Sequence, residues 1–197
     1  MKNKLLLSII LFVGLLYGCS SGGDAMNNRQ PETKSNLATT TEAKPGGPCS
    51  DPAYTQMDFW VGNWNGRSMM PDTSQESGWK IAKVQNTINK ILDGCVIEEN
   101  FEGKTFSGKS YSTYNKQQKI WHQTWVDNSG GYLPFYGIFE DDKNIFRRDF
   151  VRNGKKVSSR MVFYNITGDS FTWDWESSKD EGKTWTLSWR IEYTRNM

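Results

Sequence analysis

The sequence predicts an all-β protein that folds as an up-and-down antiparallel barrel of about ten strands. From Asp51 onward, apolar and polar residues alternate with a period of two, which is the pattern of strands with one buried face. Turn residues separate these runs at regular intervals, and no helical pattern is long enough for a βαβ crossover. A barrel is favoured because closing a meander of strands removes its two unpaired edges. A two-sheet sandwich is the alternative.

The expected strands follow one another along the chain with short connections. Several connections contain residue pairs that favour hairpin turns, among them Asp93-Gly94, Asn153-Gly154 and Gly168-Asp169. Before the strands, one helical turn is expected over residues 51–57, with Ser50 as its cap and Pro52 at its first position. The expected strands cover residues 64–70, 79–92, 95–102, 105–115, 119–127, 132–140, 144–152, 156–166, 170–177 and 184–195.

Composition and charge exclude several classes of function. The chain has 197 residues, with 24 Lys and Arg, 22 Asp and Glu, one His and three Cys. A mean hydropathy of -0.69 excludes a polytopic membrane protein, and a net charge near zero gives no basis for a nucleic-acid partner. One His and three Cys are too few for a zinc-finger module or a dedicated haem protein. Neither a cofactor nor a metal site is therefore expected.

The N-terminus is typical of an exported lipoprotein. Residues 1–18 begin with Lys2 and Lys4 and continue with a short apolar run, which is the composition of a secretory signal peptide. The run ends in Leu16-Tyr17-Gly18-Cys19, which resembles the bacterial lipoprotein box, where the cysteine thiol carries a diacylglycerol. The resemblance implies a membrane anchor at Cys19, and the expected location is the outer membrane, on its periplasmic side. An ordinary signal peptide with a chance cysteine is the alternative.

Residues 19–48 are predicted to form a flexible tether, and residues 49–197 form the barrel domain. The tether is rich in Ser, Thr, Asn, Gly, Pro and Lys, so it cannot bury enough apolar surface to offset the entropy lost on ordering. With Cys19 lipidated, Cys49 and Cys95 remain, and an exported protein in an oxidising compartment most simply pairs them. A reactive thiol is the alternative to this disulfide.

The start of the domain resembles the calycin superfamily, which includes lipocalins and fatty-acid-binding proteins. Gly62-x-Trp64 is similar to the Gly-x-Trp that begins the first barrel strand there. The resemblance implies that Trp64 packs beneath an arginine of the last strand, with Arg195 as the first choice and Arg190 as the second. The whole domain also resembles a family of uncharacterised bacterial exported proteins, a domain of unknown function. The shared motifs lie at residues 58–64, 94–99, 121–127 and 178–185.

The residues best suited to bind a ligand lie on the run from Trp121 to Asp127. Four of them share one face of an extended strand: Trp121, Gln123, Trp125 and Asp127. Two indoles beside an amide and a carboxylate suit a pocket of mixed polarity. His122 then points outward as a surface residue.

Three further residues are expected to line the same cavity, namely Trp173, Trp175 and Arg160. The leading hypothesis is therefore the non-catalytic binding of a small apolar or amphipathic ligand inside the barrel. Alternatively, tryptophans fill the barrel, and the protein acts through its outer surface on a protein partner that the sequence does not identify.

A hydrolase or isomerase is the third hypothesis. It needs an inward carboxylate, such as Asp127 or Glu98, and two titratable groups in the cavity, at least one of them with a displaced pKa. Asp174 and Glu176 alternate with two tryptophans that are expected to face inward, so both acids are predicted to lie in solvent. No residue is assigned a catalytic role.

Residues 178–185 fit the pattern Ser-x-Asp-x-Gly-x-Thr-Trp, which resembles the Asp-box hairpin of sialidases and related propellers. In such a turn Asp180 accepts hydrogen bonds from turn amides, Gly182 adopts a positive φ and Trp185 packs underneath. A rigid β-turn is expected here, with glycan binding as the alternative.

Overall fold

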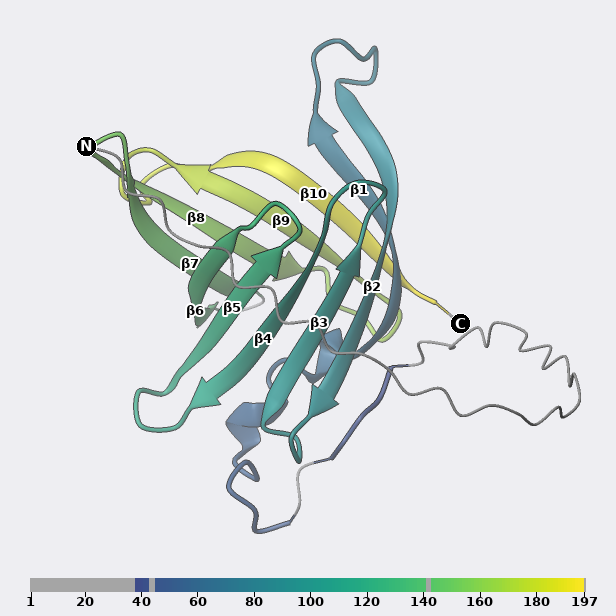
Figure 1. The fold of residues 1–197 in the computed structure, drawn as a ribbon, viewed down its shortest axis with the longest axis vertical. Coiled ribbons are helices and arrows are strands. Elements are labelled where there is room, and N and C mark those ends of the chain that lie inside the picture. Colours follow the sequence, from purple (N-terminus) through teal and green to yellow (C-terminus); the bar gives the residue numbers. More distant parts are fainter. Residues whose placement is uncertain (1–37, 43–44, 141–142, 197) are drawn as a thin grey trace, which may run out of the picture. The chain divides into compact units, whose positions relative to one another are not determined.

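The computed structural model describes residues 38–42, 45–140 and 143–196, and within them ten antiparallel strands close into one barrel (Figure 1). Each strand pairs with its neighbours along the chain, and the last strand pairs with the first. The predicted up-and-down barrel is therefore confirmed. The strands are β1 (Gly62–Pro71), β2 (Trp79–Ile91), β3 (Val96–Glu102), β4 (Ser107–Asn115), β5 (Ile120–Asp127), β6 (Tyr132–Glu140), β7 (Lys143–Arg152), β8 (Lys155–Tyr164), β9 (Ser170–Ser178) and β10 (Thr186–Arg195).

The expected signal peptide, the lipidated Cys19 and most of the tether lie outside the described residues. In the part of the chain that the structure describes, no helix is long and apolar enough to cross a membrane.

The alternation of the sequence decides which residues fill the barrel. On β3, Ile97, Glu99 and Phe101 are buried, whereas the residues between them are partly exposed. The connections follow their turn residues: Asn153 and Gly154 both have positive φ, 52° and 73°, as a two-residue hairpin turn of the primed type requires. Local turn chemistry and strand periodicity thus select the same register.

Two short 3-10 helices cover one end of the barrel, called the closed end below. They are η1 (Pro52–Thr55) and η2 (Asp58–Trp60), and they bury Tyr54, Met57 and Trp60. Both precede β1 directly, which places them at the end of the barrel where β1 begins (Figure 1).

The cap of η1 differs from the prediction. The Asp51 carboxylate, not Ser50, accepts from the backbone N–H of Ala53 at 2.9 Å. The Ser50 hydroxyl instead donates to the carbonyl of Gly47 at 2.9 Å. Both residues are good caps in sequence terms, and the short 3-10 geometry favours the one directly before Pro52.

The closed end is fastened by a disulfide. Cys49 and Cys95 are bonded, with their Cα atoms 5.2 Å apart and 46 positions apart in the sequence, so the predicted pairing is confirmed. Close by, the short segment at residues 39–41 forms backbone hydrogen bonds with Lys90 of β2. Lys90 itself is buried, and its ammonium pairs with Asp58 of η2.

The seam between β1 and β10 carries the Gly-x-Trp arrangement. Trp64 and Arg195 are register partners, and the Arg195 guanidinium lies 4.2 Å from the centre of the Trp64 ring. This is the arrangement that the resemblance to calycins implies. A side chain at Gly62 would collide with Arg195, since a Cβ there would lie 2.2 Å from its Nη1. Gly62 therefore makes room for the guanidinium.

Candidate functional site

A cavity of about 180 Å³ lies inside the barrel toward the end opposite η1 and η2, called the open end below. Its walls come from the ends of β5 and β9, the starts of β6 and β10, and the β3–β4 connection. The lining is mostly aromatic, with three polar residues. It comprises Trp60, Asn86, Glu99, Phe101, Phe106, Trp125, Asp127, Leu133, Phe135, Met161, Trp173, Trp175, Trp189, Ile191 and Tyr193.

The aromatic walls are joined by ring contacts. Trp189 is edge-on to Trp173, with ring centres 5.1 Å apart, and edge-on to Phe101, with centres 5.8 Å apart. Phe106 lies 6.0 Å from Trp125 and 6.1 Å from Trp189. Edge-to-face pairs of this kind stabilise a wall beyond the area that they bury. The walls are thus held in place by one another.

The floor of the cavity is polar and centres on Glu99. One carboxylate oxygen accepts from the Asn86 amide at 2.8 Å, and the other accepts from the Ser110 hydroxyl at 2.6 Å. Burial raises the pKa of Glu99 above its ordinary value, and the hydrogen bonds from Ser110 and Asn86 only partly oppose this. Within the described residues, no lysine, arginine or histidine pairs with it in an ion pair.

The floor also has acceptors that lack donors. Asn86 is 2% exposed, and no described atom donates to its Oδ1. Gln123 donates to Ser110 at 3.1 Å, while its own Oε1 has no donor either. Leaving such buried oxygens unpaired costs about 1–3 kcal/mol each. The polar floor is therefore incomplete as a hydrogen-bond network.

Asp127 stands at the rim of the cavity and organises the β5–β6 turn. Its carboxylate accepts from the Trp125 indole at 3.0 Å, from the backbone N–H of Gly131 at 3.0 Å, and from the backbone and side chain of Ser129. Hydrogen bonding by the Ser129 side chain contributes most to lowering the pKa of Asp127 to about 2. A carboxylate this well satisfied is a weak base.

The structure brings together four of the seven residues predicted to bind a ligand. These four line the cavity: Trp125, Asp127, Trp173 and Trp175. Gln123 lies on the same inner face of β5 and takes part in the floor network through Ser110. Trp121 also faces inward, but it is 1% exposed in the closed-end core, where its indole N–H donates to Gln56 at 2.9 Å.

Arg160 does not line the cavity, contrary to the prediction. It pairs with Glu176 at 2.6 Å, and its guanidinium stacks 4.1 Å above the Trp185 ring. Its neighbour Met161 is the residue that reaches the cavity. Since successive residues of a strand face opposite sides, Arg160 belongs to the outer face of β8.

Two further expectations for acidic residues are wrong. Glu99, not Glu98, points into the barrel: the Glu98 carboxylate accepts from Asn89 at 3.1 Å and from the hydroxyl of the exposed Tyr111. Asp174 was expected in solvent but is 4% exposed. It lies beneath Arg190, which binds it through two hydrogen bonds of 2.7 Å.

Several cavity residues have no counterpart among the predicted site residues. Asn86 and Glu99 could have been found from strand parity, because each lies two positions from buried apolar residues and so shares their face of the strand. Phe106 lies in a connection, where strand periodicity gives no information. The pairing of β10 with β9 is irregular between Leu187 and Trp189. Strand alternation therefore does not show which face of the sheet Trp189 lies on.

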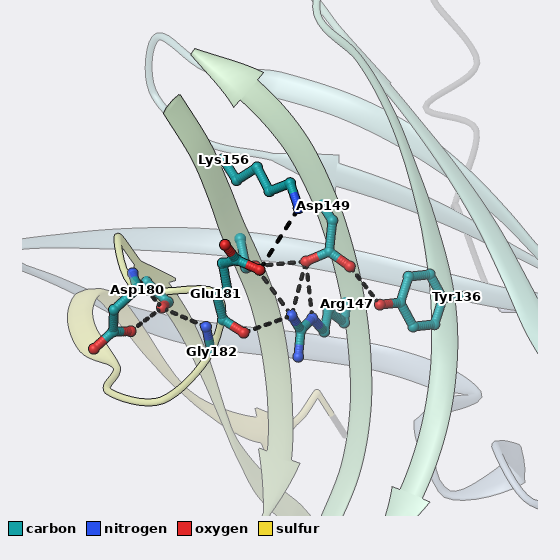
Figure 2. Close-up of polar contacts among 9 residues, drawn as sticks. Tyr136, Arg147, Asp149, Lys156, Asp180, Glu181 and Gly182 are labelled. Atoms are coloured by element: carbon teal, nitrogen blue, oxygen red, sulfur yellow. Dashed lines mark hydrogen bonds and ion pairs between the residues drawn. The ribbon is translucent and has the colours of Figure 1, made fainter. Parts of the chain in front are cut away.

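The outer face of β7 and β8 carries a separate polar cluster (Figure 2). Asp149 accepts from Tyr136 at 2.7 Å, from Arg147 at 3.0 Å and from Ser158. Although burial opposes the change, these hydrogen bonds keep the pKa of Asp149 below its ordinary value. Arg147 also donates to the carbonyl of Glu181 at 3.2 Å. The cluster thus fastens the β9–β10 connection to the barrel wall.

That connection has the geometry of a rigid turn. Asp180 accepts from the backbone N–H of Thr184 at 2.9 Å and from its hydroxyl at 2.6 Å. Gly182 has a φ of +92° and lies against Arg147, a position where a side chain would meet both strain and a collision. These contacts agree with the predicted rigid turn, and the Trp185 ring packs against the guanidinium groups of Arg147 and Arg160.

No cluster of three or more His, Cys, Asp and Glu side chains in the described ranges could hold a metal ion. His122 is exposed on the outer face of β5, and its ring contacts the Gln118 amide at 2.8 Å.

Comparisons with known proteins give only a distant structural similarity. No protein-family model matches this chain, and no curated protein matches it either. Among solved structures it is similar to Rv2717c from M. tuberculosis, with a TM-score of 0.47 and 11% sequence identity over 74% of this chain and 98% of that one. A likeness of this size carries no information about the ligand or the activity of this chain.

Proposed function

We propose that this protein binds a small, largely apolar ligand in the cavity at the open end of the barrel. The observation that carries the proposal is the cavity itself: about 180 Å³ of space with an aromatic lining and a polar floor. An interior of this kind is able to take a molecule the size of one ring with a short substituent. The cavity favours ligand binding over the alternative of a barrel filled by its own tryptophans.

A catalytic role is less well supported. Glu99 and Asp127 both line the cavity, so two titratable groups are present, as a carboxylate mechanism needs. However, Asp127 accepts hydrogen bonds from Trp125, Ser129 and Gly131, which leaves it a poor proton acceptor. Burial raises the pKa of Glu99, so Glu99 alone would have to carry any general acid–base step, without the second carboxylate that a paired mechanism uses. Binding without chemistry is therefore the better account.

The binding proposal is tested by titrating the full-length protein with 2-phenylethanol and following its tryptophan fluorescence. Trp125→Leu removes one cavity wall and should weaken binding about fivefold or more, as expected for losing the contact area of a ring. The matched control is Trp185→Leu, because Trp185 packs on Arg160 outside the cavity. Equal losses in the two variants, or no response of the wild type at millimolar alcohol, would overturn the proposal.

The proposed setting is the bacterial cell envelope, with the protein anchored by an acylated Cys19. The motifs at residues 1–19 support this part of the proposal. Metabolic labelling with an alkyne fatty acid should mark the wild-type protein and leave Cys19→Ser unmarked. A wild-type protein that stays unlabelled in the host while being exported would contradict the anchor.

A further inference from the structure

The charged residues that line the cavity are of one sign. Its lining contains two carboxyl groups, Glu99 on the floor and Asp127 at the rim, and no lysine, arginine or histidine. The Arg148 guanidinium of β7 is not among the lining residues, but it lies 5.8 Å from the ring centre of Phe135 in the cavity wall. The other polar groups facing Glu99 are neutral: Asn86 from β2, Ser110 from β4 and Tyr193 from β10. A buried carboxylate without a cation is costly. A ligand that carries the missing positive charge would remove that cost.

The Asn86 Oδ1 atom on the floor of the cavity is free to accept a hydrogen bond from a ligand. Asn86 uses its amide nitrogen on Glu99 and on the Tyr193 hydroxyl, at 2.8 and 3.4 Å, so its Oδ1 is left to accept. The residue is 2% exposed, and the oxygen has no donor within the described residues. A primary ammonium has three N–H donors and no acceptor. It therefore matches a floor made of acceptors.

The walls suit the same chemistry. Trp173, Trp175 and Trp189 lie above the floor with ring centres 5.1–6.3 Å apart. Tryptophan faces attract cations more strongly than other side-chain rings do, and the attraction grows when water is excluded. Rings and a carboxylate around one enclosed space form the kind of cage in which ammonium groups bind.

We propose that the cavity binds a small organic amine in its ammonium form, with the charged group on Glu99 and Asn86 and the apolar body among the tryptophans. The inference rests on the proposed function, because it names the ligand class of the same cavity. A cavity of about 180 Å³ limits the ligand to one ring or a short chain beyond the amine.

Binding of an ammonium is coupled to the protonation of Glu99. Burial holds Glu99 protonated in the free protein to higher pH than usual, and the ammonium needs the carboxylate. Each bound amine therefore releases the Glu99 proton to solvent. Tyr193 faces Glu99 but stays neutral, since burial raises its pKa further. Asp127 is already ionised. Affinity for the amine should accordingly rise with pH.

The test is calorimetric titration of the full-length protein with three probes of similar size: 2-phenylethylamine, 2-phenylethanol and phenylacetate. The amine should bind about tenfold or more tightly than the alcohol at pH 8, as a charge-assisted contact in an aromatic cage would give. Its affinity should rise severalfold between about pH 5 and pH 8, because the pKa of Glu99 is raised by burial, while that of the alcohol stays constant. Phenylacetate should bind weakest.

A matched variant identifies the residue. Glu99→Gln keeps the shape of the floor and removes its charge, so it should lose the preference for the amine and its pH dependence while still binding the alcohol. Glu192→Gln, a carboxylate change at an exposed position of β10, should keep both.

Alcohol binding as tight as amine binding, or amine affinity that falls with pH, would overturn the amine inference and leave the proposed function standing. Failure of all three probes would overturn the proposed function as well. The pH series on the wild type decides the matter even where Glu99→Gln does not fold.

Discussion

Asp174 and Glu99 are both more than nine-tenths buried, at 4% and 8% exposure, yet within the described residues only Asp174 has a positively charged partner. Asp174, on the outer face of β9, is held by two hydrogen bonds of 2.7 Å from Arg190 and one of 3.1 Å from Tyr164. Glu99, on the inner face of β3, has only neutral donors. One carboxylate has a complete ion pair, and the other has none.

The difference distinguishes polar groups that hold the barrel together from polar groups that are left to interact with a ligand. The cluster on β7 and β8 follows the pattern of Asp174, since Arg147, Tyr136 and Ser158 all donate to Asp149 (Figure 2). Such complete networks fix the position of strands and connections. Burying the Glu99 carboxyl has the same kind of desolvation cost, but no positively charged side chain in the described part of the chain compensates for it. That imbalance is what a ligand can correct.

The largest effect is expected where a complete pair is broken. Asp174→Asn leaves the Arg190 guanidinium without its carboxylate and should lower the free energy of unfolding by about 2–3 kcal/mol, since one partner of a buried pair is lost. Urea unfolding at pH 7, followed by tryptophan fluorescence, measures this. A loss below about 0.5 kcal/mol would show that the pair is no more than a surface contact.

A smaller effect with a distinct pH dependence is expected at Glu99. Below its ordinary pKa of 4.5 the carboxyl is protonated in both the folded and unfolded chain. As the pH rises above 4.5, the unfolded chain ionises first, because burial raises the folded pKa, so the wild type loses stability until that folded pKa is passed.

Glu99→Gln cannot ionise and should not show this loss. The variant should lie within about 1 kcal/mol of the wild type at low pH, and it should become more stable relative to the wild type as the pH rises. Urea unfolding at a series of pH values checks the slope. A relative stability that falls with pH would mean that Glu99 is ionised in the free protein.

The smallest effect is expected for Glu192→Gln, the exposed control for both variants. Glu192 pairs with Arg67 at 3.0 Å, but both side chains are about half exposed. Exposed pairs contribute about 0–1 kcal/mol, and salt weakens them further. The change in unfolding free energy should therefore be near zero in 1 M salt. A large loss there would mean that burial does not explain the contrast between Asp174 and Glu99.

Most of the fold could be predicted because it depends on local signals. Strand periodicity and turn residues such as Asn153 and Gly154 are encoded by neighbouring residues, and they gave all ten strands. The disulfide followed from counting cysteines. The cap at Asp51 could not be predicted, because Ser50 and Asp51 are equally good caps before a proline. The second 3-10 helix was not predicted either.

The site was harder because it depends on which side of the sheet a residue faces. The inner face of β5 was predicted correctly through Trp121 and Trp125. The choice of Glu98 and of Arg160 as inward residues failed by one position each, which is the error that strand parity makes easiest. Asp174 could not be placed, because its cover comes from Arg190 on the neighbouring strand, a contact across the sheet that local patterns do not contain.

The pairing of β1 with β10 also has a consequence for how the chain folds. Trp64 and Arg195 meet across the seam although 131 positions separate them, so the contact that completes the barrel closes the longest loop of all. Closing a long loop costs entropy before any contact compensates for it. Until β10 docks, the edges of β1 and β9 remain open to pairing with other chains. Aggregation during folding should therefore depend on how quickly the last strand arrives.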